Sequence, residues 1–509
     1  MKNDGQFADS ALNELSSLLK RPHLFLTITE LLGWDEQVYL PPGGAEHRAE
    51  QLSALAEAAH AAVSDPRIGE QLAALESPEA FEKLTAPGRA IIRCARRDYD
   101  RATKLPAEFV REKAAQTSRA YHAWAAAREK SDFASYAPML EKNIELVRRE
   151  AAHLGHGGTG AEAYDYMIDQ HDPGMNAAVT EKLFGELKAG LAPLVRRITE
   201  SPVKARPDLL RGFPVEKQHA FLRDVTERIG FDYNHGRIDI SIHPFCSGTG
   251  DDIRMTTRYD ENNPLDSLFS AIHEAGHGIY EQGLTAGVRH TALGQAAGMG
   301  VHESQSRLWE NQVARSRGFW RWFEPRFRAA FPEQMRAISP DEFYLAVNAV
   351  QPTLIRVDAD EVTYNLHIIL RFELEKKLFS GELAIADLPR AWNAASRELL
   401  GLEPQNDREG VLQDVHWSAA SFGYFPSYCI GNMVAAQLWY SALAERPALE
   451  DDFARGDFSW MLKWLREKIH SQGKQHDTLE LVRHATGGEL SPKWLLRYLE
   501  ERYAPLYLK

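Results

Sequence analysis

The chain has 509 residues, of which 44% are hydrophobic and 26% charged, the composition of a folded globular protein. Its formal net charge of -13 opposes binding to nucleic acid, because a protein that neutralises phosphates needs a basic surface. The three cysteines, Cys94, Cys246 and Cys429, are far apart, so they indicate neither a disulfide framework nor a thiolate metal cluster. We therefore expect a reducing compartment and no nucleic-acid partner.

The sequence shows no targeting or membrane segment. The first residues, MKNDGQFADSALNEL, lack a cationic stretch followed by an apolar core. Nowhere does an uncharged apolar run reach about 18 residues, the length that spans a bilayer as a helix. We therefore expect a cytoplasmic protein with no membrane partner.

Helical patterns dominate the chain. Residues 45–63 and 138–154 are rich in Ala, Leu, Glu and Arg, with apolar residues three and four positions apart. The segment LGHGGTG at 154–160 interrupts this pattern and predicts a turn or a flexible joint. We expect a mainly α fold in which residues 1–509 form a single domain, with a soft internal boundary near 154–165.

One stretch has the period of a β-strand instead. Between Arg237 and His243, isoleucines alternate with polar residues, as in a half-buried strand. Residues 255–259 are a candidate partner strand, and SGTG at 247–250 is the candidate turn between them. Because both strands precede the richest motif of the chain, we expect a small β-sheet at the border of the functional cleft.

That motif runs from His273 to His277 and reads His-Glu-Ala-Gly-His. On an α-helix the two histidines lie on one face, within reach of a single cation. Glu274 points about 100° away from the two ligands. From there it can act as general base on a water at the metal without entering the coordination shell. The motif therefore predicts a metal-dependent hydrolase.

A catalytic zinc generally takes three protein ligands, so a third must come from outside the motif. In one class of metallopeptidases a histidine follows six residues after the second, but here that position is Gly283. Downstream, His302 and Glu303 open another helical stretch, and as helix neighbours about 100° apart they are not both expected to bind one ion. Glu303 is the preferred ligand and His302 its rival. The alternative for Glu303 is an i,i+4 surface pair with Arg307.

Six segments of the chain together carry a family resemblance. They read HPF at 243–245, DIRMT at 252–256, HEAGH at 273–277, HESQ at 302–305, IRVDAD at 355–360 and GVLQDVHW at 410–417. Each resembles a block of the carboxypeptidase Taq family of zinc metallocarboxypeptidases, over roughly residues 20–505. The resemblance implies that Glu303 is the third ligand and Glu274 the base. It also implies a homodimer and a large helical fold around a deep active-site groove.

A carboxypeptidase must bind the free terminal carboxylate of its substrate, which a guanidinium can do through two parallel charge-assisted bonds. The resemblance favours Arg356 for this role, whereas its sequence alone favours a structural ion pair with Asp358 or Asp360. His416 and Tyr424 are candidates to hydrogen-bond the carboxylate or the developing oxyanion, the alternative being satisfied core groups. His243 is a further candidate, as a residue that lines the groove.

The sequence thus predicts a zinc-dependent carboxypeptidase catalytic domain that releases single amino acids from peptides with a free C-terminal carboxylate. Broad specificity is what the family resemblance implies. Two histidines and a glutamate would also accept Co²⁺ or Mn²⁺ in place of Zn²⁺. Two alternatives stay open: a helical zinc endopeptidase or dipeptidase, and a catalytically silent scaffold of the same fold.

Overall fold

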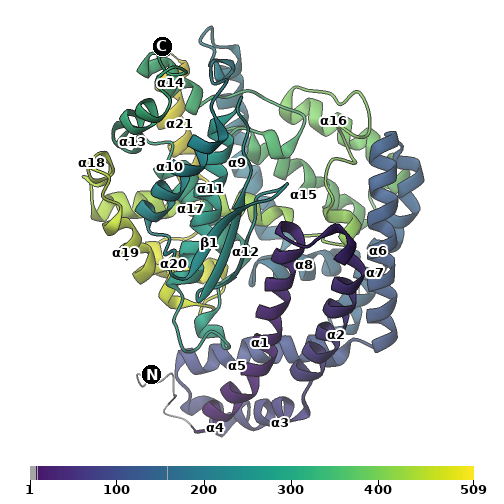
Figure 1. The fold of residues 1–509 in the computed structure, drawn as a ribbon. Helices are drawn as coiled ribbons and strands as arrows, with labels where there is room; N and C mark the ends of the chain where they lie inside the picture. Colours follow the sequence, from purple (N-terminus) through teal and green to yellow (C-terminus); the bar gives the residue numbers. More distant parts are fainter. Residues whose placement is uncertain (1–6, 8–9, 158, 509) are drawn as a thin grey trace. The chain divides into compact units, whose positions relative to one another are not determined.

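A computed structural model describes residues 7, 10–157 and 159–508. Most of the N-terminal residues on which the expectation about targeting signals rests, 1–6 and 8–9, lie outside the described residues. Helices predominate and the strands form one small sheet (Figure 1), so the prediction of a mainly α fold is confirmed. In the described part of the chain, no helix is long and apolar enough to cross a membrane.

The chain forms two compact units, each of which draws on separate stretches of sequence. The first contains Met1–Thr103, Arg206–Val347 and Ala435–Glu489, and the second contains Lys104–Ala205, Asn348–Val434 and Leu490–Lys509. Near the expected boundary at 154–165, the described residues 154–157 follow one helix of the second unit, and residues 160–165 already belong to the next helix. That all 509 residues act as one domain stays a prediction, as does the groove.

In the first unit, a long N-terminal helix packs against its neighbour and against the sheet. α1 (Ser10–Val38) and α2 (Ala45–Val63) lie side by side, drawn in purple in Figure 1. Trp34 of α1 is 3% exposed and lies under the guanidinium groups of Arg237, at 5.1 Å, and Arg254, at 4.3 Å. These cation–π contacts hold α1 to the sheet.

The sheet has three strands, β1 (Gly236–Ile240), β2 (Cys246–Thr249) and β3 (Asp252–Thr257), in the order β1-β3-β2. β1 runs parallel to β3, and β2 runs antiparallel to it. Residues 247–250 were expected as a turn, but most of them belong to β2, and the turn itself is Gly250–Asp251. Fully buried Ile253 and Met255 fix β3 in the core, so the SGTG backbone satisfies its polar groups by pairing with that strand.

Two helices of the first unit contact each other closely, and one of them also packs on the sheet. α11 (Pro264–Gly283) packs against β3, α10 (Val215–Ile229) and α12 (Met299–Arg307). Gly276 allows the closest approach, because a Cβ at this position would lie 2.6 Å from the Cα of Ser306 and 2.8 Å from the carbonyl oxygen of Gln305. The backbones of α11 and α12 therefore touch directly. The remaining helices of this unit are α3 (Pro66–Leu75), α4 (Pro78–Lys83), α5 (Ala86–Lys104), α13 (Arg317–Ala330), α14 (Pro340–Val347), the C-terminal half of α17 (Phe425–Glu445), α18 (Leu449–Ala454), α19 (Ser459–Lys468) and α20 (Thr478–Thr486).

The second unit is helical throughout its described elements. They are α6 (Ala107–Lys130), α7 (Phe133–His153), α8 (Gly160–His171), α9 (Ala177–Glu200), α15 (Tyr364–Ser380), α16 (Leu388–Leu400), the N-terminal half of α17 and α21 (Lys493–Tyr507). A buried carboxylate, Glu375 of α15, ties several segments together. It accepts hydrogen bonds from Trp417 Nε1 at 2.6 Å, Tyr164 Oη at 3.0 Å and the backbone N–H of Gly423 at 3.0 Å.

Candidate active site

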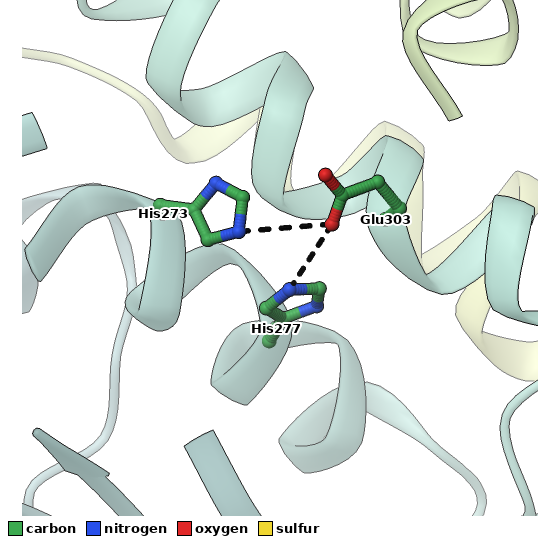
Figure 2. Close-up of side chains that lie close together, drawn as sticks. All are labelled: His273, His277 and Glu303. Carbon is green, nitrogen blue, oxygen red and sulfur yellow. Dashed lines mark ion pairs between the residues drawn. The ribbon is translucent and has the colours of Figure 1, made fainter. Parts of the chain in front are cut away.

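His273, His277 and Glu303 converge between α11 and α12 in the first unit (Figure 2). Glu303 Oε2 lies 3.6 Å from His273 Nε2 and 3.4 Å from His277 Nε2. A tetrahedral ion with metal–ligand bonds of about 2.0–2.2 Å separates its ligands by about 3.3–3.6 Å. The donor atoms therefore have the spacing that a single bound cation requires.

The hydrogen bond of His273 to Glu310 determines which nitrogen of its ring faces Glu303. Its Nδ1 lies 2.8 Å from Glu310 Oε2, a carboxylate oxygen that can only accept, so Nδ1 carries the proton. In the neutral ring, Nε2 then turns a lone pair toward the carboxylate of Glu303. Burial opposes a positive charge on His273, but Glu303 and Glu310 outweigh it and raise the pKa of the imidazole. The cluster attracts positive charge, and a divalent cation fits its donor set.

Glu303 stays ionised although it is only 6% exposed. Burial raises the pKa of its carboxyl. The neighbouring Arg307 and His273 outweigh this effect and bring the pKa well below its usual range. Arg307 Nε donates to Oε1 at 2.7 Å, and Ser306 Oγ donates to Oε2 at 3.2 Å. The i,i+4 pair with Arg307 therefore exists, though buried rather than on the surface. It uses one carboxylate oxygen and leaves the other to face the histidines.

Glu274 lies beside the cluster and is 8% exposed. Burial raises the pKa of its carboxyl to about 7, with a further rise from Glu303 and Glu310 against the opposing effect of His273. A divalent cation in the cluster would favour the charged form again. Glu274 is therefore a buried carboxyl whose protonation depends on the charges of the neighbouring cluster.

Two acidic residues that no sequence motif indicated, Glu310 and Glu281, contact histidines at or beside the cluster. Glu310 lies in a π-helical turn, Leu308–Val313, that follows α12, and it also accepts from Arg307 Nη1 at 3.1 Å. Glu281 lies in the last turns of α11 and contacts His302 Nε2 at 3.0 Å. Glu310 follows Glu303 by seven residues and Glu281 follows His277 by four. These spacings place each pair on one helix face, and they are the only indication of the two residues in the sequence.

His302, the rival third ligand, is outside the ligand cluster. Its Nδ1 lies 2.6 Å from Nδ1 of His277, on the opposite edge of that ring from the Nε2 that faces Glu303. The candidate ligand on α12 is therefore Glu303, and its neighbour His302 contacts the candidate ligand His277 on its Nδ1 side instead.

Gly283 cannot be replaced by a ligand because another side chain fills its space. A Cβ at this position would lie 2.1 Å from Nδ1 and 2.8 Å from Cγ of His470. His470 is fully buried, and its Nε2 lies 3.1 Å from Oε1 of Gln305 on α12. The absence of a histidine at 283 thus has a packing reason.

Arg356 lies in the second unit and is 6% exposed. Its Nε donates to Asp414 Oδ1 at 2.9 Å and its Nη1 to Tyr364 Oη at 3.2 Å. Fully buried Arg371 donates to the other oxygen of Asp414 at 2.7 Å. The alternative interpretation of Arg356 as part of an ion pair with Asp358 or Asp360 differs from the structure in its partner, because the pair is made with Asp414, which is distant in sequence. Burial disfavours the charge on Arg356, but Asp414 dominates and raises the pKa of the guanidinium.

His416 and Tyr424 lie in the same part of the second unit. Their rings are 5.5 Å apart, and His416 Nε2 lies 3.4 Å from the hydroxyl of Tyr428, over whose ring Arg356 lies at 5.2 Å. Burial lowers the pKa of His416 to about 4, so the ring is neutral, and its Nδ1 has no hydrogen-bond partner among the described residues. The structure therefore groups Arg356, His416 and Tyr424. His243 is exposed in the first unit, in the loop from β1 to β2.

A helical fold with this site is typical of one class of protein, a metallopeptidase. Two histidines and a buried glutamate lie on one helix, and a second glutamate comes from another helix. The family described as "Carboxypeptidase Taq (M32) metallopeptidase" matches residues 14–503. The chain belongs to this family and is accordingly a metallocarboxypeptidase, a peptide hydrolase that acts at the C-terminus.

Individual relatives agree with this membership along the whole chain. Thermostable carboxypeptidase 1 of Thermus thermophilus is 42% identical over 510 residues, which cover 98% of this chain and 99% of that protein. Carboxypeptidase 1 of Bacillus subtilis is 38% identical over 499 residues, 97% and 98% of the two chains. The crystal structure of an M32 carboxypeptidase from Deinococcus radiodurans R1 superposes with a TM-score of 0.94 at 43% identity, covering 98% of this chain and 100% of that one.

Proposed function

We propose that the chain is a zinc-dependent carboxypeptidase of broad specificity that releases single amino acids from peptides. The observation that supports this most is the cluster of His273, His277 and Glu303 with Glu274 buried beside it. Zinc bound there would polarise the scissile carbonyl and acidify water, and Co²⁺ or Mn²⁺ would suit the same donors.

In this proposal Glu274 moves the proton of the reaction. Its carboxylate takes a proton from the attacking water as the water oxygen bonds to the carbonyl carbon. It then delivers that proton to the amine nitrogen as the C–N bond breaks. Burial of Glu274 keeps bulk water from competing for the proton. Arg307 keeps Glu303 ionised, so that this carboxylate stays a ligand and does not compete as an acid.

Arg356 would bind the terminal carboxylate of the substrate. Support comes from the charge balance: in the direct ion pairs of the described residues, Arg356 and Arg371 share the single carboxylate of Asp414. A buried pair of guanidinium groups with one carboxylate carries excess positive charge, which a bound anion compensates. His416 and Tyr424 would add hydrogen bonds to that anion, and His243 would line the path of the peptide.

The test is mass spectrometry of an N-terminally blocked peptide incubated with metal-loaded protein, beside the same peptide with a C-terminal amide. Stepwise loss of single residues from the free acid only is the expected result. Internal cleavage of both peptides would favour the endopeptidase alternative and remove Arg356 from its role. If the metal binds and neither peptide changes, the chain is a silent scaffold.

Two substitutions test the residue roles. Glu274→Gln should keep the metal but lower hydrolysis by about 10²–10⁴-fold, because the base is lost while the ligands remain. Arg356→Lys should raise KM, because an ammonium cannot make the paired bonds of a guanidinium. Arg390→Lys, at a side chain that is 82% exposed in the same unit, is the matched control and should behave like the parent. Wild-type turnover by Glu274→Gln would refute the assignment of the base.

We further propose that the protein is a cytoplasmic homodimer. The support for the dimer is the family resemblance, and the support for the compartment is the sparse cysteine content. Light scattering coupled to size exclusion gives the mass in solution, for which we expect twice the chain mass of 57.4 kDa. A mass equal to one chain would refute the dimer.

A further inference from the structure

The two histidines of the candidate metal site are supported from behind in different ways. His273 donates its Nδ1 proton directly to the carboxylate of Glu310. His277 has no such carboxylate at its Nδ1, which faces Nδ1 of His302 at 2.6 Å. The imidazole of His302 therefore takes the place that the carboxylate of Glu310 has behind His273. Either Nδ1, that of His277 or that of His302, could carry the proton of the bond between them.

The rings of His277 and His302 meet through their edges. Their centroids are 4.6 Å apart, well beyond the 2.6 Å between the two Nδ1 atoms, and the ring planes differ by 29°. Each ring thus turns its Nδ1 edge toward the other, the geometry of an N–H···N hydrogen bond. One nitrogen must donate and the other must accept, because two N–H groups would repel each other and two lone pairs would form no bond.

Glu281 decides which ring donates. Its Oε1 lies 3.0 Å from His302 Nε2, and since a carboxylate only accepts, the proton of His302 lies on Nε2. A neutral His302 then has a bare Nδ1 that accepts the Nδ1 proton of His277. His277 is left with a bare Nε2, the nitrogen that lies 3.4 Å from Glu303 Oε2 in the ligand cluster.

We propose that His302, held by Glu281, is a positioning residue that fixes the tautomer of His277 so that its Nε2 is free to bind the metal. α12 then supplies two functions from adjacent residues, a ligand at Glu303 and the support of a ligand at His302. The inference rests on the proposed ligand set. It adds a role for the residue that does not itself join the cluster.

The inference predicts how substitutions at one position differ. His302→Leu removes the acceptor and should weaken metal binding by about 10- to 100-fold, the usual cost of losing a partner behind a ligand. His302→Asn can place its amide oxygen where Nδ1 was, so it should retain most of the affinity. His290→Leu is the matched control, since His290 is a half-buried residue of the same unit that bonds Ser16 away from the cluster.

The experiment measures the zinc dissociation constant of each metal-free variant by competition with a chromophoric chelator. It also records the ring ¹⁵N shifts of His277 in the histidine-labelled parent. The inference predicts a proton on Nδ1 of His277, and an order of affinity in which the parent, His290→Leu and His302→Asn exceed His302→Leu. A proton on Nε2, or equal affinities for His302→Leu and His290→Leu, would overturn it. His277→Leu separates the two levels: if that variant binds zinc like the parent, the proposed ligand set itself fails.

Discussion

Substituting Gly276 by alanine should separate the two helices that carry the candidate ligands. The new Cβ would lie 2.6 Å from the Cα of Ser306, whereas ordinary contact begins at 3.4 Å, so the backbones must part by the difference, about 0.8 Å. A metal site tolerates displacements of about 0.5 Å in its ligands. Because Glu303 lies on the displaced helix and the histidines on the other, we expect metal affinity to fall by about 10- to 100-fold.

The same change should lower the free energy of unfolding by about 1–3 kcal/mol, the usual cost of overpacking. Chelator competition gives the affinity, and urea denaturation of the metal-free protein gives the stability. Gly33→Ala is the matched control, because Gly33 also lies in a helix of the first unit and a Cβ there would meet nothing within 4 Å. It should gain up to about 1 kcal/mol from helix propensity and bind metal normally. If Gly276→Ala binds metal as tightly as the parent, the contact between α11 and α12 does not set the ligand geometry.

Three further predictions concern stability. Glu375→Gln places an amide NH₂ against hydrogen-bond donors of the second unit. The free energy of unfolding, measured by urea denaturation, should fall by about 1–3 kcal/mol for each donor left unpaired, and an unchanged midpoint would contradict this. Burial raises the pKa of Glu30 to about 7, with Glu281 adding to the rise, so the folded state loses stability as the pH rises from about 4.5 through 7. Glu30→Gln should therefore raise the melting temperature of the metal-free protein above pH 7, with a gain that vanishes toward pH 4.5; a gain independent of pH would refute the titration. Removing the metal should lower stability by about 2.7 kcal/mol relative to protein in free metal at 100 times Kd, as measured by denaturation with and without chelator.

The parts of the site that were predictable are those in which function follows from helical periodicity. The spacing of His273 and His277 determines that both can reach one cation, and the position of Glu274 follows from the same rotation per residue. The choice between His302 and Glu303 could not be made from spacing. Either side chain can face the histidines, depending on how α12 is rotated about its own axis, and the sequence does not specify that rotation. The close backbone contact at Gly276, a tertiary property, brings α12 against α11 where Glu303 faces the histidines.

Residues whose partners are distant in sequence were the hardest to predict. The alternative considered for Arg356 is an ion pair with an aspartate a few positions away, and the aspartate it contacts is the distant Asp414. Glu310 and Glu281 act through other side chains, so no motif of ligand types marks them. The SGTG segment has the composition of a turn, and only the buried neighbour strand made it a strand.

The space beside Gly283 is filled by His470, and this affects which helices a bound metal would connect. Because His470 occupies that position, a ligand side chain does not fit at residue 283, and the third candidate ligand lies on α12. An ion held by ligands from both helices would bind the folded chain and not the unfolded one, so it would act as a reversible cross-link that stabilises the docked arrangement of α11 and α12. A metal held by neighbours within one helix would have no such effect. Here metal binding would be coupled to the docking of two helices.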